Sequence, residues 1–162
     1  GHDRRSDDCG ICRGSGSCAG GEQMKGDRIK YRADGRKYQL AEGYAVKIGV
    51  LQALRIGHGY FSLDPTGWLM VRRGYAWDGP SGPACDTPSA MRGSLVHDVL
   101  YQALRLGLLA SAWREVADRE YRRLCLEDGM WRLRAAYHFA ALRWFGRPST
   151  EPEAEPPVLE AP

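Results

Sequence analysis

A loop dense in glycine and proline divides this chain into two halves with different hydrophobic periods. The loop covers residues 75–88 and reads Tyr-Ala-Trp-Asp-Gly-Pro-Ser-Gly-Pro-Ala-Cys-Asp-Thr-Pro. Before it the apolar pattern is typical of short strands, and after it apolar residues recur about every 3.6 positions, as in helices. Strands followed by helices predict an α+β fold, with a small N-terminal antiparallel sheet and a three-helix C-terminal half.

One hairpin is well marked in the first half. Residues 60–63 (Tyr-Phe-Ser-Leu) and 68–71 (Trp-Leu-Met-Val) flank Asp64-Pro-Thr-Gly67. Proline and glycine stand there at positions that turns favour, so the two segments are expected to pair as antiparallel strands. Residues 38–40 and 44–50 are shorter strand candidates.

Capping residues predict the bounds of three helices. We expect the first helix to have Thr87 as its N-cap and Pro88 at its first position, and to end before Gly107. The second is expected over about 111–128 and the third over about 130–145, each closed by a glycine.

The two ends of the sequence differ in composition from the middle. Residues 1–23 consist largely of glycine, serine, aspartate and cysteine, which predicts a flexible arm. Residues 148–162 hold five prolines and four glutamates, which predicts a disordered tail. A single globular domain is therefore expected over 24–147.

Charge is concentrated in that middle segment. It carries 20 basic and 12 acidic side chains, whereas the whole chain has a formal net charge of +3. A basic domain suits a phospholipid surface, nucleic acid or an acidic protein, although an arginine-rich solvated surface gives the same count. The uncharged stretch Leu106–Trp113 is too short to cross a bilayer. With no apolar leader visible, a cytoplasmic or virion-associated location is the default expectation.

The first expected helix carries the most chemical segment of the chain. His97 and Tyr101 are four residues apart and share one helix face, while Asp98 points about 100° away. A histidine can activate water as a general base, and a neighbouring carboxylate can hold a cation. If the first two helices pack antiparallel, Asp118 faces His97 and fixes its tautomer. Asp78 lies in the preceding loop, where carbonyl and carboxylate oxygens suit calcium.

These segments resemble a family of short phage and prophage proteins whose function is unknown. The shared marks are the Trp-Asp-Gly-Pro-Ser-Gly-Pro loop (77–83), the Leu-Val-His-Asp-x-x-Tyr helix (95–101) and the Ala-Asp pair at 117–118. The resemblance covers about residues 36–146. It implies a link to phages, which composition alone does not indicate.

A more distant similarity joins the same residues to prokaryotic phospholipases A2, which have a His-Asp-x-x-Tyr helix after a calcium loop. It implies His97 as general base, Asp118 as its orienting partner and Tyr101 as support for the hydrogen-bond network. It also implies Asp78 and Asp98 as calcium ligands. Those enzymes are all-helical and held by disulfides, whereas this chain opens with strands. Whether the chain's Cys85 and Cys125 pair stays open.

Other metal and catalytic patterns are weaker. A phosphohydrolase of the His-Asp type would need a second upstream histidine, and only His58, in a loop-like context, is available. Cys9, Cys12 and Cys18 form half of a zinc site, but no second well-spaced pair follows, so we do not expect zinc there.

Three functions remain open from the sequence. One is a calcium-assisted lipid esterase, that is, a carboxylic ester hydrolase. A second is a non-catalytic phage structural or accessory protein, in which the His-Asp-Tyr residues form a buried polar network. The third is a basic module that binds nucleic acid or a lipid surface, for which aromatic and arginine residues alternate over 131–145.

Overall fold

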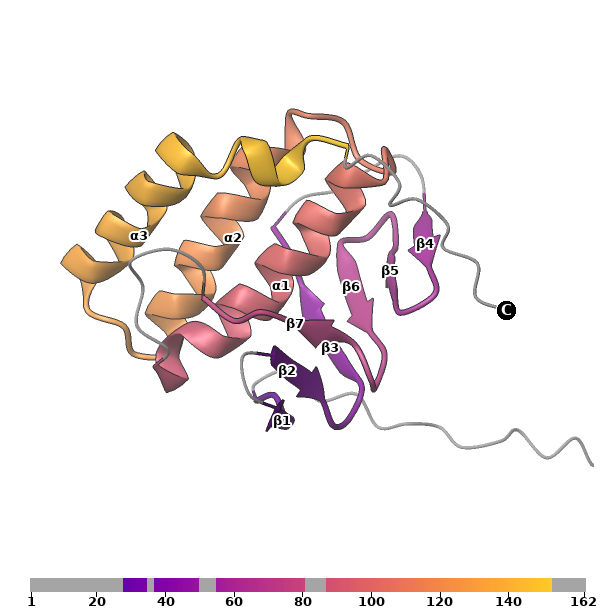
Figure 1. The fold of residues 1–162 in the computed structure, drawn as a ribbon, viewed down its shortest axis with the longest axis horizontal. Helices are drawn as coiled ribbons and strands as arrows, with labels where there is room; N and C mark the ends of the chain where they lie inside the picture. Colours follow the sequence, from indigo (N-terminus) through magenta and orange to yellow (C-terminus); the bar gives the residue numbers. More distant parts are fainter. Residues whose placement is uncertain (1–27, 35–36, 50–54, 81–86, 153–162) are drawn as a thin grey trace, which may run out of the picture.

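The predicted α+β arrangement is confirmed by a computed structural model, which describes residues 28–34, 37–49, 55–80 and 87–152. The predicted arm 1–23 and the tail from 153 onward lie outside the described residues. Strands come first and helices follow (Figure 1). The elements are β1 Tyr31–Asp34, β2 Lys37–Leu40, β3 Tyr44–Lys47, β4 Ile56–His58, β5 Phe61–Leu63, β6 Trp68–Val71, β7 Ala76–Trp77, α1 Pro88–Arg105, α2 Trp113–Glu127, α3 Arg132–Phe145 and the 3₁₀ helix η1 Pro148–Thr150.

The strands form two antiparallel sheets where the sequence predicts one. The first has the order β1-β2-β7 and the second the order β3-β6-β5-β4. β2 and β3 are neighbours in the chain but belong to different sheets. β2 pairs instead with the later strand β7, and Tyr38 lies opposite Trp77. The pairing of β2 with β7 is extended by Leu40, whose N–H donates to the Tyr75 carbonyl at 2.8 Å. This long-range pairing places Trp77 beside α1, where its indole N–H meets the Ser94 hydroxyl.

The predicted hairpin is confirmed as β5 and β6. Within its turn, Asp64 Oδ1 accepts hydrogen bonds from the N–H groups of Thr66 and Trp68, both at 2.9 Å. Gly67 has a φ of 89°, which glycine adopts at no steric cost. The predicted strand 44–50 is shorter in the structure, since β3 ends at Lys47.

Helix α1 lies between the sheets and the other two helices (Figure 1). Thirteen of its 18 residues are buried, so both of its long faces pack against protein. Its predicted start is confirmed, but the Thr87 side chain makes no capping hydrogen bond and contacts the Ser89 hydroxyl at 3.3 Å instead. Gly107 follows the helix end with a φ of 67°, as a C-terminal glycine does.

The contact between α1 and α2 is tight at Gly93. A Cβ atom at this position would lie 2.9 Å from the Cys125 sulfur and 3.0 Å from the Tyr121 carbonyl. We therefore expect Gly93→Ala to destabilise the protein by about 1–3 kcal/mol, as overpacking of a core contact does. Urea unfolding measures the change. Gly59→Ala is the matched control because nothing lies within 4 Å of its added methyl group; equal stabilities of the two variants would contradict the prediction.

The described chain continues past the predicted boundary at residue 147. Residues Pro148–Thr150 form η1, and the Arg105 guanidinium of α1 donates to the Ser149 carbonyl at 2.9 Å. This contact closes one end of the space between α1 and α3. Within the described segments, no helix combines the length and apolar character needed to span a membrane.

Candidate functional site

Side chains from all three helices converge on the carboxylate of Asp118. Its side chain is fully buried on α2, with 0% exposure. His97 and Tyr101 of α1 reach Oδ1, through Nε2 at 3.1 Å and the hydroxyl at 2.7 Å. Arg143 of α3 donates to Oδ2 at 3.1 Å. The structure thus brings together the three residues that the sequence predicts as a catalytic group and adds a cation.

Local helix geometry explains the α1 and α2 parts of this cluster. His97 and Tyr101 are one turn apart, and their rings pack with centroids 3.9 Å apart. Because α2 runs back along α1 after a short connection, its buried Asp118 faces that turn (Figure 1). Arg143 was missed by the sequence analysis. A buried carboxylate generally needs a cationic partner, and this predicts that some arginine lies close to Asp118. The sequence alone does not indicate which arginine it is.

The network fixes how His97 is protonated. Burial acts to raise the pKa of Asp118, but hydrogen bonds from His97 and Tyr101 outweigh it and hold that pKa below its ordinary value. An ionised carboxylate only accepts hydrogen bonds, so His97 Nε2 carries the proton. In the neutral ring Nδ1 is then the free base.

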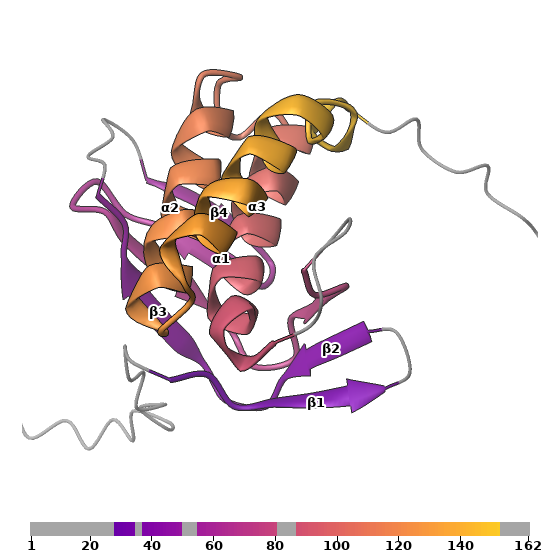
Figure 2. The same ribbon diagram turned by 90° about the vertical axis from the view of Figure 1, so that its left-hand side faces the viewer.

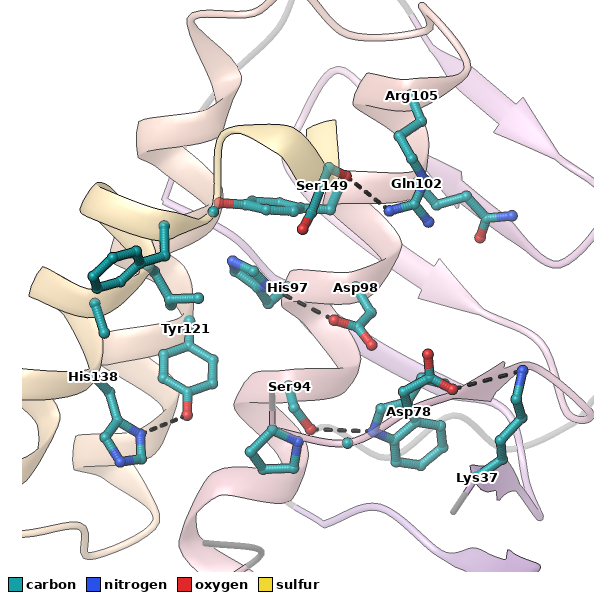
Figure 3. Close-up of a pocket in the computed structure, with 18 of the residues that line it drawn as sticks. Lys37, Asp78, Ser94, His97, Asp98, Gln102, Arg105, Tyr121, His138 and Ser149 are labelled. Carbon is teal, nitrogen blue, oxygen red and sulfur yellow. Dashed lines mark hydrogen bonds and ion pairs between the residues drawn. The ribbon is translucent and has the colours of Figure 1, made fainter. Parts of the chain in front are cut away.

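A second carboxylate tunes the same imidazole. Asp98 Oδ1 lies 3.6 Å from His97 Nδ1 (Figure 3). Burial acts to lower the pKa of His97, but hydrogen bonds to Asp118 and Asp98 outweigh burial and raise the pKa above its usual value. The two carboxylates therefore favour the protonated imidazolium, in which Nδ1 faces Asp98.

His97 lines a pocket of about 560 Å³ between α1, α3 and the β7 loop (Figure 3). Six of the lining side chains are aromatic, and the lining also contains two basic side chains and two aspartates. The aromatic residues are Tyr75, Trp77, Tyr101, Tyr121, Tyr137 and Phe145, and the charged ones besides His97 are Lys37, Asp78, Asp98 and Arg105. Apolar walls with a few polar groups are what small-molecule sites generally have.

The Gly/Pro loop reaches this pocket through Trp77. The indole N–H of Trp77 donates to the Ser94 hydroxyl at 3.1 Å, and Ser94 donates in turn to the Met91 carbonyl at 2.9 Å. Gly79 then turns the chain with a φ of 82°. Asp78 is thereby placed at the pocket, as the sequence analysis expects, although the anchoring Trp77–Ser94 bond was not foreseen.

The two expected calcium ligands line one pocket but face different partners. Asp78 lies 3.6 Å from the Lys37 ammonium, and Asp98 lies near His97 (Figure 3). Among the described residues, no group of three His, Cys, Asp or Glu side chains could hold a metal ion. Calcium generally takes six to eight oxygen ligands, which these two carboxylates alone do not supply. We therefore derive no chemical step through calcium.

A second hydrogen-bonded histidine, paired with a tyrosine, lies in the same pocket. The Tyr121 hydroxyl and His138 Nδ1 are 2.8 Å apart, and both side chains are buried. Burial and the Arg134 charge hold the pKa of His138 below its usual value. His138 is therefore a buried histidine of α3 that a tyrosine hydroxyl of α2 holds in place.

The remaining candidates are not part of this pocket. His58, the upstream histidine of the phosphohydrolase scheme, is exposed on β4 with its ring tilted against Phe61, and it does not line the pocket. Cys125 is buried, and burial raises the pKa of its thiol to about 12. Cys85 and the predicted partial zinc set Cys9, Cys12 and Cys18 lie outside the described residues.

Comparisons with protein-family models, curated proteins and solved structures found no match to this chain. The resemblances to the phage family and to phospholipases A2 stay predictions.

Proposed function

We propose that the chain hydrolyses carboxylic esters and that its substrate is a phospholipid. One observation carries this proposal: the buried Asp118 accepts a hydrogen bond from Nε2 of His97, and the same imidazole lines a pocket with aromatic and charged side chains. A carboxylate that fixes a histidine tautomer is the arrangement that general-base catalysis uses.

The chemistry needs one water molecule and one ester. Nδ1 of His97 accepts a proton from the water as its oxygen attacks the ester carbonyl carbon. The tetrahedral intermediate then breaks its bond to the alcohol oxygen, and His97 returns the proton to that oxygen. Asp118 stabilises the imidazolium between these two steps. Tyr101 and Arg143 keep Asp118 ionised and in place.

The lining of the pocket supports an amphiphilic substrate. Tyr137 and Phe145 from α3 provide apolar surface for an acyl chain, while the Arg105 guanidinium brings positive charge to the same pocket. A phosphodiester headgroup with an acyl chain combines these two requirements. The link to phages rests on the sequence resemblance alone and stays a prediction.

A structural role is the second candidate, and one observation favours it. The Asp118 network ties α1, α2 and α3 together, which a buried polar network can do without any chemistry. The two functions differ in what the pocket is for. Only the hydrolase needs His97 Nδ1 to be accessible to a small molecule.

Product analysis on mixed phospholipid vesicles tests the proposal. The purified protein is incubated with phosphatidylcholine and phosphatidylglycerol vesicles, in calcium and separately in excess chelator. We expect equal amounts of fatty acid and lysophospholipid. Release of fatty acid with calcium but not with chelator would support the prediction that Asp78 and Asp98 are calcium ligands. A folded protein that releases no fatty acid in either condition would overturn the hydrolase proposal.

The pH dependence of hydrolysis gives a prediction for Asp98. A general base works when deprotonated, so the rate rises as pH passes the raised pKa of His97. Asp98→Asn removes one carboxylate that raises this pKa, so the acidic limb is expected to move to lower pH. The pH profile of kcat/KM on a soluble short-chain phospholipid measures it. An unmoved limb would contradict the prediction, and loss of rate at every pH with a higher calcium requirement would identify Asp98 as a ligand.

A further inference from the structure

The outward face of α3 is apolar. Ala135 and His138 are the buried residues of this helix, and they point toward α2 and the pocket. On the opposite side lie Leu133, Tyr137 and Trp144, which are 64%, 54% and 78% exposed. Their spacing of four and seven residues places them in one stripe along the helix. α3 lies on the side of the helices away from the sheets, so none of the described elements covers this stripe (Figures 1 and 2).

Arginines flank the stripe, and no acid does. Arg132 lies on one side of it and Arg134 on the other, each about 100° around the helix from Leu133. Between Asp128 and Glu151 the sequence contains no Asp or Glu. An apolar stripe between cationic flanks is the pattern of a helix that lies in the interface of an anionic bilayer.

We propose that α3 docks the protein on anionic phospholipid membranes, with the stripe of Leu133, Tyr137 and Trp144 inserted among the headgroups. The inference deepens the proposed phospholipid hydrolysis and rests on it for its biological sense. Tyr137 belongs both to the stripe and to the lining of the His97 pocket. A lipid held at the stripe therefore lies beside the pocket.

The same charges argue against a second copy of the chain as the occupant. Pairing of two α3 helices through this stripe would bring Arg132 and Arg134 against the same arginines of the other copy. Like charges at the flanks of a helix pair are unfavourable, and no glutamate on α3 compensates them. Anionic headgroups complement the flanks instead.

Vesicle co-sedimentation tests the proposal without any turnover. Binding is measured to phosphatidylcholine vesicles with and without phosphatidylglycerol, using the His97→Gln protein so that hydrolysis plays no part. We expect binding that requires phosphatidylglycerol, weakens with salt, and falls about tenfold or more in a further L133Q/W144Q variant, because two large apolar side chains no longer insert. Neither residue lines the pocket.

The matched control is Trp68→Gln, which removes an exposed tryptophan from β6 on the sheet side. It is expected to bind vesicles like its parent, and thermal melts check that all variants are folded. Equal binding by L133Q/W144Q and its parent, or no vesicle binding by the parent, would overturn the proposal. Binding of single-stranded DNA through the stripe, without vesicle binding, would also overturn it. Vesicle binding without any hydrolysis by the wild type would retain the docking surface and reject the hydrolase.

Discussion

Replacing His97 with glutamine is expected to lower the rate of ester hydrolysis by about 10²–10⁴-fold, the usual contribution of a positioned general base. The glutamine amide can still donate to Asp118, so the buried carboxylate keeps a partner and the fold is retained. The rate is measured on a short-chain phospholipid below its micelle concentration, so that membrane docking does not enter the result.

His138→Gln is the matched control for this variant. His138 is also a buried histidine that lines the pocket, but its Nδ1 contacts the Tyr121 hydroxyl rather than a carboxylate. We expect a much smaller loss of rate from this change. Equal losses in the two variants would mean that the pocket tolerates no substitution, and would remove the special role of His97.

Replacing Asp118 with alanine is expected to destabilise the protein by about 3 kcal/mol or more. The change leaves two buried donors, from His97 and Tyr101, without their acceptor and takes the counter-charge from Arg143. Urea unfolding measures the loss. Asp118→Asn keeps the shape of the side chain and part of its hydrogen bonding, so it is expected to lose less stability. This variant is measured if the alanine variant does not fold.

Asp98→Ala is the control for the Asp118 change. The Asp98 side chain is 27% exposed and lies 3.6 Å from His97, so its removal is expected to change stability by less than about 1 kcal/mol. If Asp98→Ala and Asp118→Ala were equally stable, the three-helix network would not be the support that its geometry indicates.

The parts of the fold with local signals could be predicted from the sequence. Pro88 and Gly107 mark the ends of α1, and the Asp64-Pro-Thr-Gly67 turn marks the β5–β6 hairpin. The sequence analysis missed β1, β4 and β7. These strands have only two to four residues, too few for a period to show. β1 and β4 each pair with the strand that follows, whereas β7 pairs with the distant strand β2. The same long-range pairing divides the strands into two sheets.

The candidate site divides in the same way. The spacing of His97, Tyr101 and Asp118 predicted their meeting, because it depends on one helix face and one antiparallel helix pair. The Arg143 contact depends on how α3 is rotated, which capping residues do not determine. The Lys37–Asp78 ion pair joins β2 to the loop after β7, and nothing local in the sequence indicates it.

The most direct test of His97 as the base is to modify its free nitrogen and follow hydrolysis at the same time. A phenacyl bromide alkylates neutral imidazole and carries an aromatic ring suited to the pocket. Peptide mapping by mass spectrometry locates the label, and His58, exposed on β4, serves as an internal comparison. We predict that hydrolysis falls in step with labelling of His97, and that a short-chain phospholipid slows both. Full activity after complete labelling of His97, or loss of activity with His97 unlabelled, would contradict the assignment.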